Sequence, residues 1–245
     1  KSEVKLAGSV IGGVLCDEED QMLGVQDFIR QGHADYITGA IICEPEDGLI
    51  CVTQKGALRA RFTITGKMSH GAMPLAGLNT APAVSQIITR LHGMERAAVA
   101  SPGRDEFLGW PSFTPTVIQA PAGGAPQLNF MPGEAQILVD IRTIPGQSHP
   151  EIIESLENLA VEIKHQIQQD YEAYDKLLEV KRNRELNVSV EILTDRPCTL
   201  TDRNDPVVQA AYWATRRLTQ KEPQFAGVPG ATDGTFLWAL KNIPI

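Results

Sequence analysis

The 245-residue sequence predicts an α/β fold in which a mainly parallel α/β unit is interrupted by an inserted ferredoxin-like α+β unit. Residues 10–15 and 36–43 are apolar runs typical of strands buried on both faces, and the segment between them has helical spacing. Residues 55–195 change to strands of alternating polarity and long amphipathic helices. We therefore expect residues 1–54 and 196–245 to form the two parts of one unit, with residues 55–195 inserted between them.

The composition is that of an ordinary globular protein, with 42% hydrophobic and 21% charged residues. The formal net charge of −8 argues against nucleic acid or an anionic membrane as a partner. No apolar run approaches the roughly 20 residues that a membrane-spanning helix needs, and no signal peptide is visible, so we expect a cytoplasmic protein. Cys16, Cys43, Cys51 and Cys198 show no C-x-x-C spacing and are expected to be reduced; the first two lie at the predicted buried strands.

Carboxylates follow each of the two apolar runs. Asp17, Glu18, Glu19 and Asp20 come directly after the first run, and Glu44 comes directly after the second. In open α/β sheets ligands bind at the carboxyl ends of the strands, and acids crowded there repel one another unless a cation or a shared proton relieves them. Hard divalent cations are the usual relief. For the first cluster alone, an acidic helix start that suits the helix dipole is an equally good interpretation, and the second set of acids favours the cation.

The inserted unit follows the order β-α-β-β-α-β, which is the split βαβ pattern of ferredoxin-like domains. Its predicted elements are a strand over 58–66, a helix over 80–92, strands over 116–120 and 135–142, a helix over 150–184 and a strand over 188–193. An edge strand or helix face of such a unit can pair with its own copy about a two-fold axis.

The last part of the chain returns to the α/β pattern. It predicts a helix over 206–219, a strand that begins at Phe225, a helix over 232–241 and a further strand that begins at Ile243.

Four motifs of this sequence resemble those of a known family, the co-catalytic zinc amidohydrolases that include acetylornithine deacetylase, succinyl-diaminopimelate desuccinylase, carboxypeptidase G and aminoacylase. They are Asp17-Glu18-Glu19, Glu44-Pro45, Ser69-His70-Gly71-Ala72-Met73-Pro74 and Gly230-Ala231-Thr232-Asp233-Gly234. Their order and spacing agree with the family along nearly the whole chain. The resemblance implies an α/β zinc-peptidase catalytic domain interrupted by a lid domain that also forms a homodimer.

The resemblance further implies hydrolysis of an amide bond by water held between two zinc ions per subunit, with cobalt or manganese able to replace zinc. It makes Glu18 the general base, Glu19 a ligand of one zinc ion and Glu44 a ligand of the other; spacing alone does not divide these roles. The implied substrate is an N-acyl amino acid. A peptide substrate, cleaved by a dipeptidase or carboxypeptidase of the same family, is the alternative.

By the same resemblance, His70 is a lid histidine that reaches across the dimer to stabilise the oxyanion in the partner's site. Asn129 and Arg142 resemble the lid residues that hold the substrate carbonyl and carboxylate. Backbone N–H groups of the loop that enters the last helix would receive an anionic group of the substrate, with Thr232 and Asp233 as the contributing residues. Taken singly, His70 also fits a polar turn, Arg142 a solvated strand end and Asp233 a helix cap.

Other histidines are expected at the surface. Gly32-His33-Ala34-Asp35 superficially matches the family's metal-binding His-x-Asp, but it follows a helix that Gly32 would end, so we interpret His33 as a turn residue. His92, His149 and His165 have no motif context. Because the family's upstream His-x-Asp, its bridging aspartate and its last histidine ligand are absent from the sequence, we expect the chain to be the middle of a longer enzyme. An alternative of another class is that it acts only as a dimerisation module.

Overall fold

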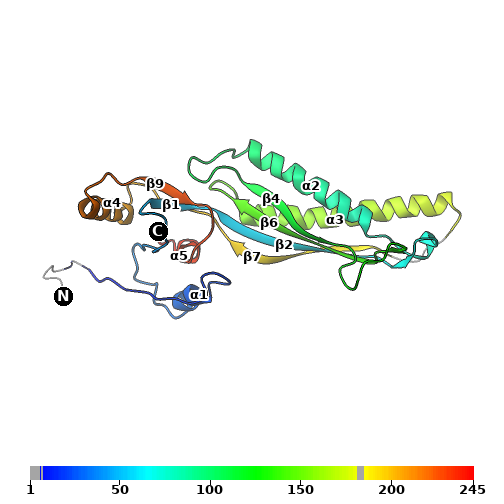
Figure 1. Ribbon diagram of the computed structural model, residues 1–245, viewed down its shortest axis with the longest axis horizontal. Helices are drawn as coiled ribbons and strands as arrows, with labels where there is room; N and C mark the ends of the chain where they lie inside the picture. The colour runs from blue at the N-terminus through cyan, green and yellow to red at the C-terminus, as the bar shows by residue number, and fades with distance from the viewer. Residues whose placement is uncertain (1–5, 7, 181–184) are drawn as a thin grey trace.

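The computed structural model describes residues 6, 8–180 and 185–245. In chain order its elements are α1 (Leu23–Arg30), β1 (Ile50–Gln54), β2 (Gly56–Thr65), β3 (Ser69–His70), the 3₁₀ helix η1 (Pro74–Ala76), α2 (Ala81–Ala100), β4 (Ser112–Gln119), β5 (Phe130–Met131), β6 (Glu134–Thr143), α3 (His149–Leu177), β7 (Asn187–Arg196), β8 (Thr199–Leu200), α4 (Pro206–Thr219), β9 (Phe225–Val228) and α5 (Gly234–Lys241). The molecule is elongated, with α1, α4 and α5 toward one end and the long strands β2, β6 and β7 running to the other (Figure 1).

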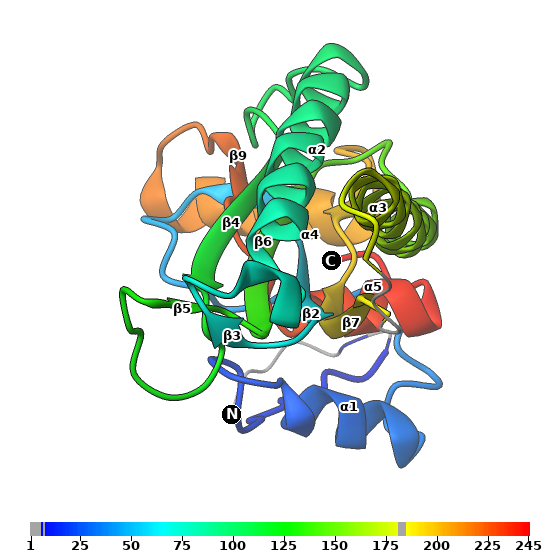
Figure 2. The same cartoon turned by 90° about the vertical axis from the view of Figure 1, so that its right-hand side faces the viewer.

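The inserted unit is a four-stranded antiparallel sheet in the order β4-β6-β2-β7, covered on one face by α2 and α3 (Figure 2). This strand order confirms the ferredoxin-like prediction. Alternate residues of β2, including Leu58, Phe62 and Ile64, are fully buried and pack with the apolar stripes of both helices. The core of the molecule therefore lies between this sheet and its two helices.

A smaller sheet lies beside the inserted unit, with β1 between β8 and β9. β1 pairs parallel with β9 and antiparallel with β8. A second apolar cluster joins α1 to α5 through Met22, Val25, Ile29, Leu237 and Ile243. The chain passes from β1 into β2 at Lys55 and from β7 into β8 at Pro197, so two neighbouring crossings connect the two sheets.

Three predicted strands are wrong. Residues 10–15, 36–43 and 243–245 have no strand structure, and Val10, Val14 and Ile41 are well exposed, Val14 completely. The reason is that a strand needs a neighbouring strand to pair with, and in the described part of the chain these segments make only scattered contacts, such as those of Ala40 N–H with the Pro244 carbonyl and of Ile245 N–H with the Thr201 hydroxyl. Consequently Cys16 and Cys43, expected in buried strands, are exposed free thiols.

The predicted helices are present with shifted ends. α2 runs to Ala100 because Gly93 does not interrupt it. α3 ends at Leu177, before Glu179 adopts a left-handed conformation, and residues 181–184 of the longer predicted helix lie outside the described residues. No helix in the described part of the chain is long and apolar enough to cross a membrane.

The histidine predictions are partly confirmed. α1 ends in a Schellman motif, in which Gly32 (φ +81°) donates its N–H to the Ile29 carbonyl and His33 donates to the Phe28 carbonyl, so His33 is an exposed turn residue. His92 and His165 are exposed as well. His149 is different: it is only 4% exposed, and the prediction of a surface residue was wrong because the sequence alone does not reveal its buried partners at the ends of β6 and β7.

Candidate active site

The first acidic segment is a tight turn that leads into α1. The Asp17 carboxylate accepts hydrogen bonds from the backbone N–H groups of Gln21 and Leu23, both at 3.3 Å, and Asp17 itself has a φ of +67°. The Asp17 side chain therefore stabilises this turn by hydrogen bonds to its backbone, and Glu18 and Glu19 are residues of the turn. The sequence predicted that a strand leads into this turn, but in the structure residues 10–15, which have no strand structure, lead into it.

Gly24 in the first turn of α1 makes this geometry possible. Its N–H bonds to the Cys16 carbonyl at 3.1 Å, and a Cβ at position 24 would lie 2.6 Å from the backbone nitrogen and oxygen of Cys16. Only glycine allows the segment before the acids to cross the helix so closely.

Four carboxylates of the prediction come together in space from three segments of the chain. Burial raises the pKa of Glu18, and the negative charges of Glu44, Glu19 and Asp233 raise it further. Burial likewise raises the pKa of Asp233, with Glu44 as the next cause. Each of these carboxylates therefore lies within reach of the electric field of the others.

The Gly230 to Gly234 loop is fixed by its threonine. Gln54 accepts bonds from both the N–H and the hydroxyl of Thr232, at 2.9 and 3.0 Å, and the Thr232 hydroxyl accepts from Gly234 N–H at 3.2 Å. Thr232, 3% exposed, therefore caps α5. Asp233 makes no capping bond, so the capping interpretation is wrong, and its Oδ1 is buried without a partner among the described residues.

The chemistry of these groups fits a divalent cation, because Asp233 has a buried carboxylate oxygen without a partner among the described residues and the negative charge of Glu44 acts on it. Their number is too small. Within the described part of the chain, no three side chains of the His, Cys, Asp or Glu type are arranged to hold a metal ion. A catalytic zinc site needs three protein ligands, so Glu19 and Glu44 supply only part of one.

Arg196, which the sequence analysis missed, lies against the acidic turn. Its Nη2 donates to the backbone carbonyl of Asp20, and it is the cation that lowers the pKa of Glu18. Burial, together with the charge of Arg59, lowers the pKa of Arg196 itself. A signal was present in the sequence, since an arginine at the end of an alternating strand and directly before Pro197 lies at the predicted boundary between the two units.

At the other end of the inserted unit the structure brings His70 and Asn129 together. His70 Nδ1 accepts a bond from Ala72 N–H at 3.1 Å, which leaves the proton of a neutral ring on Nε2. Nε2 lies 3.3 Å from Asn129 Nδ2, so in this tautomer two N–H donors lie side by side, and Phe130 packs edge-on against the ring. Both side chains are exposed. The tip therefore presents an imidazole N–H donor beside an amide.

The tip lies far from the acids of the same chain. The ten-residue strand β2 runs from the acids to the tip, with Gly56 at the acid end and Thr65 at the end near β3. The two ends of this strand are about 30 Å apart. Figure 2, which looks at the right-hand side of Figure 1, shows β3 and β5 at this outer end. His70 and Glu18 therefore do not share a site within one chain.

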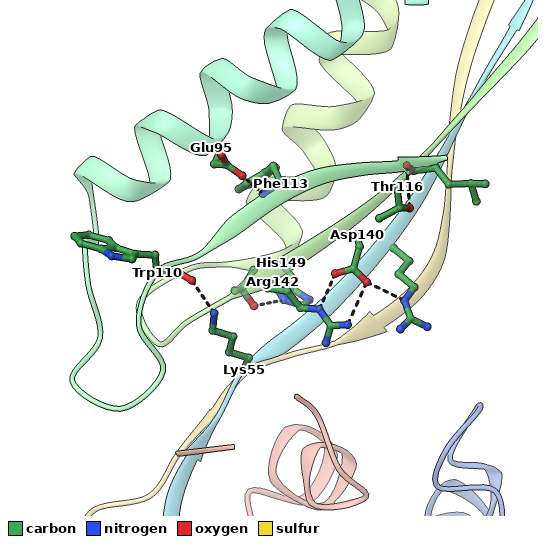
Figure 3. A network of polar contacts seen from close by, with 11 residues as sticks. Lys55, Glu95, Trp110, Phe113, Thr116, Asp140, Arg142 and His149 are labelled. Atoms are coloured by element: carbon green, nitrogen blue, oxygen red, sulfur yellow. Dashed lines mark hydrogen bonds and ion pairs between the residues drawn. The ribbon is translucent and has the colours of Figure 1, made fainter. Parts of the chain in front are cut away.

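Arg142 lies at the acid end of β6, away from Asn129. Its Nε and Nη2 donate to the two oxygens of Asp140 at 2.6 and 3.2 Å (Figure 3), and Arg59 donates to the same carboxylate at 3.2 Å. Burial and the charge of Arg142 lower the pKa of neighbouring Lys55, which donates to the Trp110 carbonyl at 2.7 Å. Arg142 is thus a half-buried, ion-paired residue rather than a solvated strand end.

Comparison with known proteins agrees with this arrangement. Residues 52–168 match the peptidase dimerisation domain, M20_dimer. The sequence is 24% identical over 199 residues to an uncharacterised metallohydrolase of Methanococcus maripaludis, covering 79% of this chain and 45% of that protein. It is 26% identical over 158 residues to acetylornithine deacetylase of Vibrio cholerae, covering 64% of this chain and 39% of that protein. Residues 52–168 are therefore similar to the dimerisation domain of M20 peptidases.

A further relative and a solved structure are similar to most of this chain. A probable succinyl-diaminopimelate desuccinylase of Staphylococcus aureus is 20% identical over 81% of this chain and 52% of its own length. Aminopeptidase PepT of Bacillus cereus has the same fold, with a TM-score of 0.61 and 17% identity over 93% of this chain and 52% of its own. The fold class is thereby confirmed as a mixed α/β protein with an M20 dimerisation domain. The chain spans about half the length of these relatives.

Proposed function

We propose that this chain is part of a homodimeric, cytoplasmic M20 metallohydrolase that removes the acyl group from an N-acyl amino acid. We propose the domain boundaries 1–54, 55–195 and 196–245, with the inserted unit as the lid and dimerisation domain. The observation that supports catalysis most strongly is the meeting of Glu18, Glu44 and Asp233 from distant parts of the chain. Burial and the neighbouring negative charges raise the pKa values of Glu18 and Asp233, and such perturbed carboxylates are typical of a catalytic centre.

Glu18 is the general base in this proposal. Its raised pKa brings it closer to neutrality, where a carboxylate can take a proton from water and return it to the leaving amine. In the full-length protein Glu19 would supply one ligand to one of two zinc ions and Glu44 one ligand to the other, and cobalt or manganese could replace the zinc. The bound metal supplies a Lewis acid and a water of lowered pKa.

The lid residues act on the substrate. The Nε2–H donor of His70 and the adjacent Asn129 amide, exposed at the outer tip, stabilise the carbonyl oxygen in the partner subunit's site. Arg142 binds the substrate carboxylate at the acid end of the sheet, where Asp140 holds its guanidinium plane in one orientation. Asp233 and the loop that Thr232 fixes lie against the remaining polar groups of the substrate.

The substrate class rests on the relatives named acetylornithine deacetylase and succinyl-diaminopimelate desuccinylase. The second candidate is a dipeptidase or carboxypeptidase of the same family, and the third is a dimerisation module without activity. The full-length gene product, loaded with zinc, should be assayed against acetylated and succinylated amino acids and a matched set of dipeptides. Hydrolysis of dipeptides alone would overturn the deacylase assignment, and hydrolysis of neither set would leave only the dimerisation module.

The roles of the two neighbouring glutamates are tested in the same protein. Glu18→Gln should abolish turnover with the metal content unchanged, because it removes a base and no ligand. Glu19→Gln should lose metal. If metal analysis gave the reverse pattern, the two roles would have to be exchanged.

A further inference from the structure

Two arginines and an alanine form a row across the acid end of the inserted sheet. Ala57 on β2 lies opposite Arg142 on β6 and opposite Arg196 on β7. Side chains directly opposite one another share a face of the sheet, and this face is the one that α2 and α3 leave uncovered. The small, buried Ala57 between them gives both guanidinium groups room to lie over the sheet.

Arg196 is directed out of this row toward the acidic turn. The positive charges of Arg59 and Arg142 repel it, while the carboxylates of Glu18 and Asp20 attract it. Its Nη2 donates to the Asp20 backbone carbonyl, a contact between residues that are 176 positions apart. A hydrogen bond from a charged donor is stronger than one between neutral groups. This bond ties the turn that carries Glu18 to the end of β7.

On the opposite face, a buried histidine fixes the same strand ends. His149 Nδ1 lies 2.6 Å from Asp195 Oδ1, and its Nε2 lies 2.8 Å from Thr143 Oγ1. Asp195 and Thr143 are the chain neighbours of Arg196 and Arg142, and neighbours along a strand point to opposite faces. One imidazole therefore connects the backbone segments that carry both arginines.

Gly56 leaves the space that this network needs. A Cβ at position 56 would lie 2.2 Å from Thr143 Oγ1 and 2.9 Å from His149 Nε2. At the junction between the two units, the sheet face toward α2 and α3 is therefore closely packed around His149, and the opposite face carries the charged side chains of Arg142 and Arg196.

We propose that Arg196 is a positioning residue that holds residues 17–20, and with them Glu18, against the end of the inserted sheet. His149 supports it from behind through Asp195. The structural part of this proposal stands on the contacts above, and its consequence for catalysis rests on the proposed function of Glu18. If Arg196 were only a solvated surface residue, its replacement would leave the acidic turn unchanged.

The structural part is tested by hydrogen exchange in the 245-residue chain. The informative amides are those of residues 21–24, all four of which bond to Asp17 or Cys16. Arg196→Gln should raise their exchange rate about tenfold, and Arg196→Lys, which keeps a charged donor, should raise it less. Arg61→Gln is the matched control, because Arg61 lies on the same sheet and pairs with Glu191 at 2.5 Å. Unchanged exchange in Arg196→Gln, or an equal rise in the control, would overturn the proposal.

The catalytic consequence is tested in the full-length enzyme. Arg196→Gln should lower kcat about tenfold and change KM less than about twofold, since it displaces the base and not the substrate. Arg61→Gln should leave both constants unchanged. A raised KM with an unchanged kcat would mean that Arg196 binds substrate instead. If the wild-type enzyme hydrolyses no amide, the proposed function fails, and the exchange experiment alone then decides whether Arg196 positions the turn.

Discussion

The inserted unit and residues 8–48 have similarly apolar sequences but very different structures. In the inserted unit, β2 is paired along its length on both sides, and the buried residues of the sheet pack against two helices. In residues 8–48 the one regular element is α1, and the apolar side chains of Val10 and Val14 are exposed. The difference teaches that an apolar run specifies burial only where neighbouring strands are available to take its hydrogen bonds.

The largest expected loss of stability comes from truncating a core side chain of the inserted unit. Phe62 is fully buried in the sheet core, so Phe62→Ala should lower the free energy of unfolding by about 3 to 5 kcal/mol. Val14→Ala, at a fully exposed side chain, should change it by less than about 0.5 kcal/mol. Denaturant unfolding measures both. Comparable losses would mean that residues 10–15 are packed after all.

The junction between the two sheets should give an intermediate effect. Gly56→Ala drives a Cβ into Thr143, Cys198 and His149 and should cost about 1 to 3 kcal/mol of stability. Gly93→Ala is the matched control, because its Cβ meets nothing within 4 Å in the middle of α2, and it should stabilise the protein by about 0.5 to 1 kcal/mol. Thermal unfolding of both variants compares them. A neutral Gly56→Ala would show that the His149 network is loosely packed.

The smallest effect is expected at the acid cluster. Burial and Glu44 raise the pKa of Asp233 above its ordinary value of 3.8, so the folded state binds this proton more tightly than the unfolded state. Ionisation then costs stability at pH values above that ordinary value, and the cost disappears once the carboxyl is protonated in both states. Asp233→Asn should therefore raise Tm by about 1 to 3 °C at pH 7 and not at pH 3.5. A lower Tm at pH 7 would contradict the repulsion.

The sequence predicted the inserted unit well because its signals are local. Alternation in β2 and β6, and apolar stripes in α2 and α3, each specify one face, and the antiparallel partners lie within the same 140 residues or so. The helix over Pro206–Thr219 was predicted to the residue, since Asp205 caps it and Pro206 occupies its first position. The end of α1 at Gly32 was predicted from the glycine alone, and the structure shows that it is a Schellman motif.

The candidate site was predictable only in part. The acid motifs predicted that Glu18, Glu19 and Glu44 lie near one another, and in the structure burial and the charges of Glu44 and Glu19 raise the pKa of Glu18. Arg196 and His149 were not found, because their partners Asp20, Asp195 and Thr143 are distant in sequence and no spacing connects them. Nor did the motif for residues 230–234 reveal that Thr232, and not Asp233, caps α5.

The central claim is that His70 and the acids, about 30 Å apart in one chain, meet between two subunits of the full-length protein. His70→Ala and Glu18→Gln proteins, each inactive alone, should be mixed under conditions of demonstrated subunit exchange. With random exchange half of the dimers are mixed and each has one intact site, so the account predicts recovery of about a quarter of wild-type activity. No recovery would contradict it, because His70 would then act within its own chain or not at all.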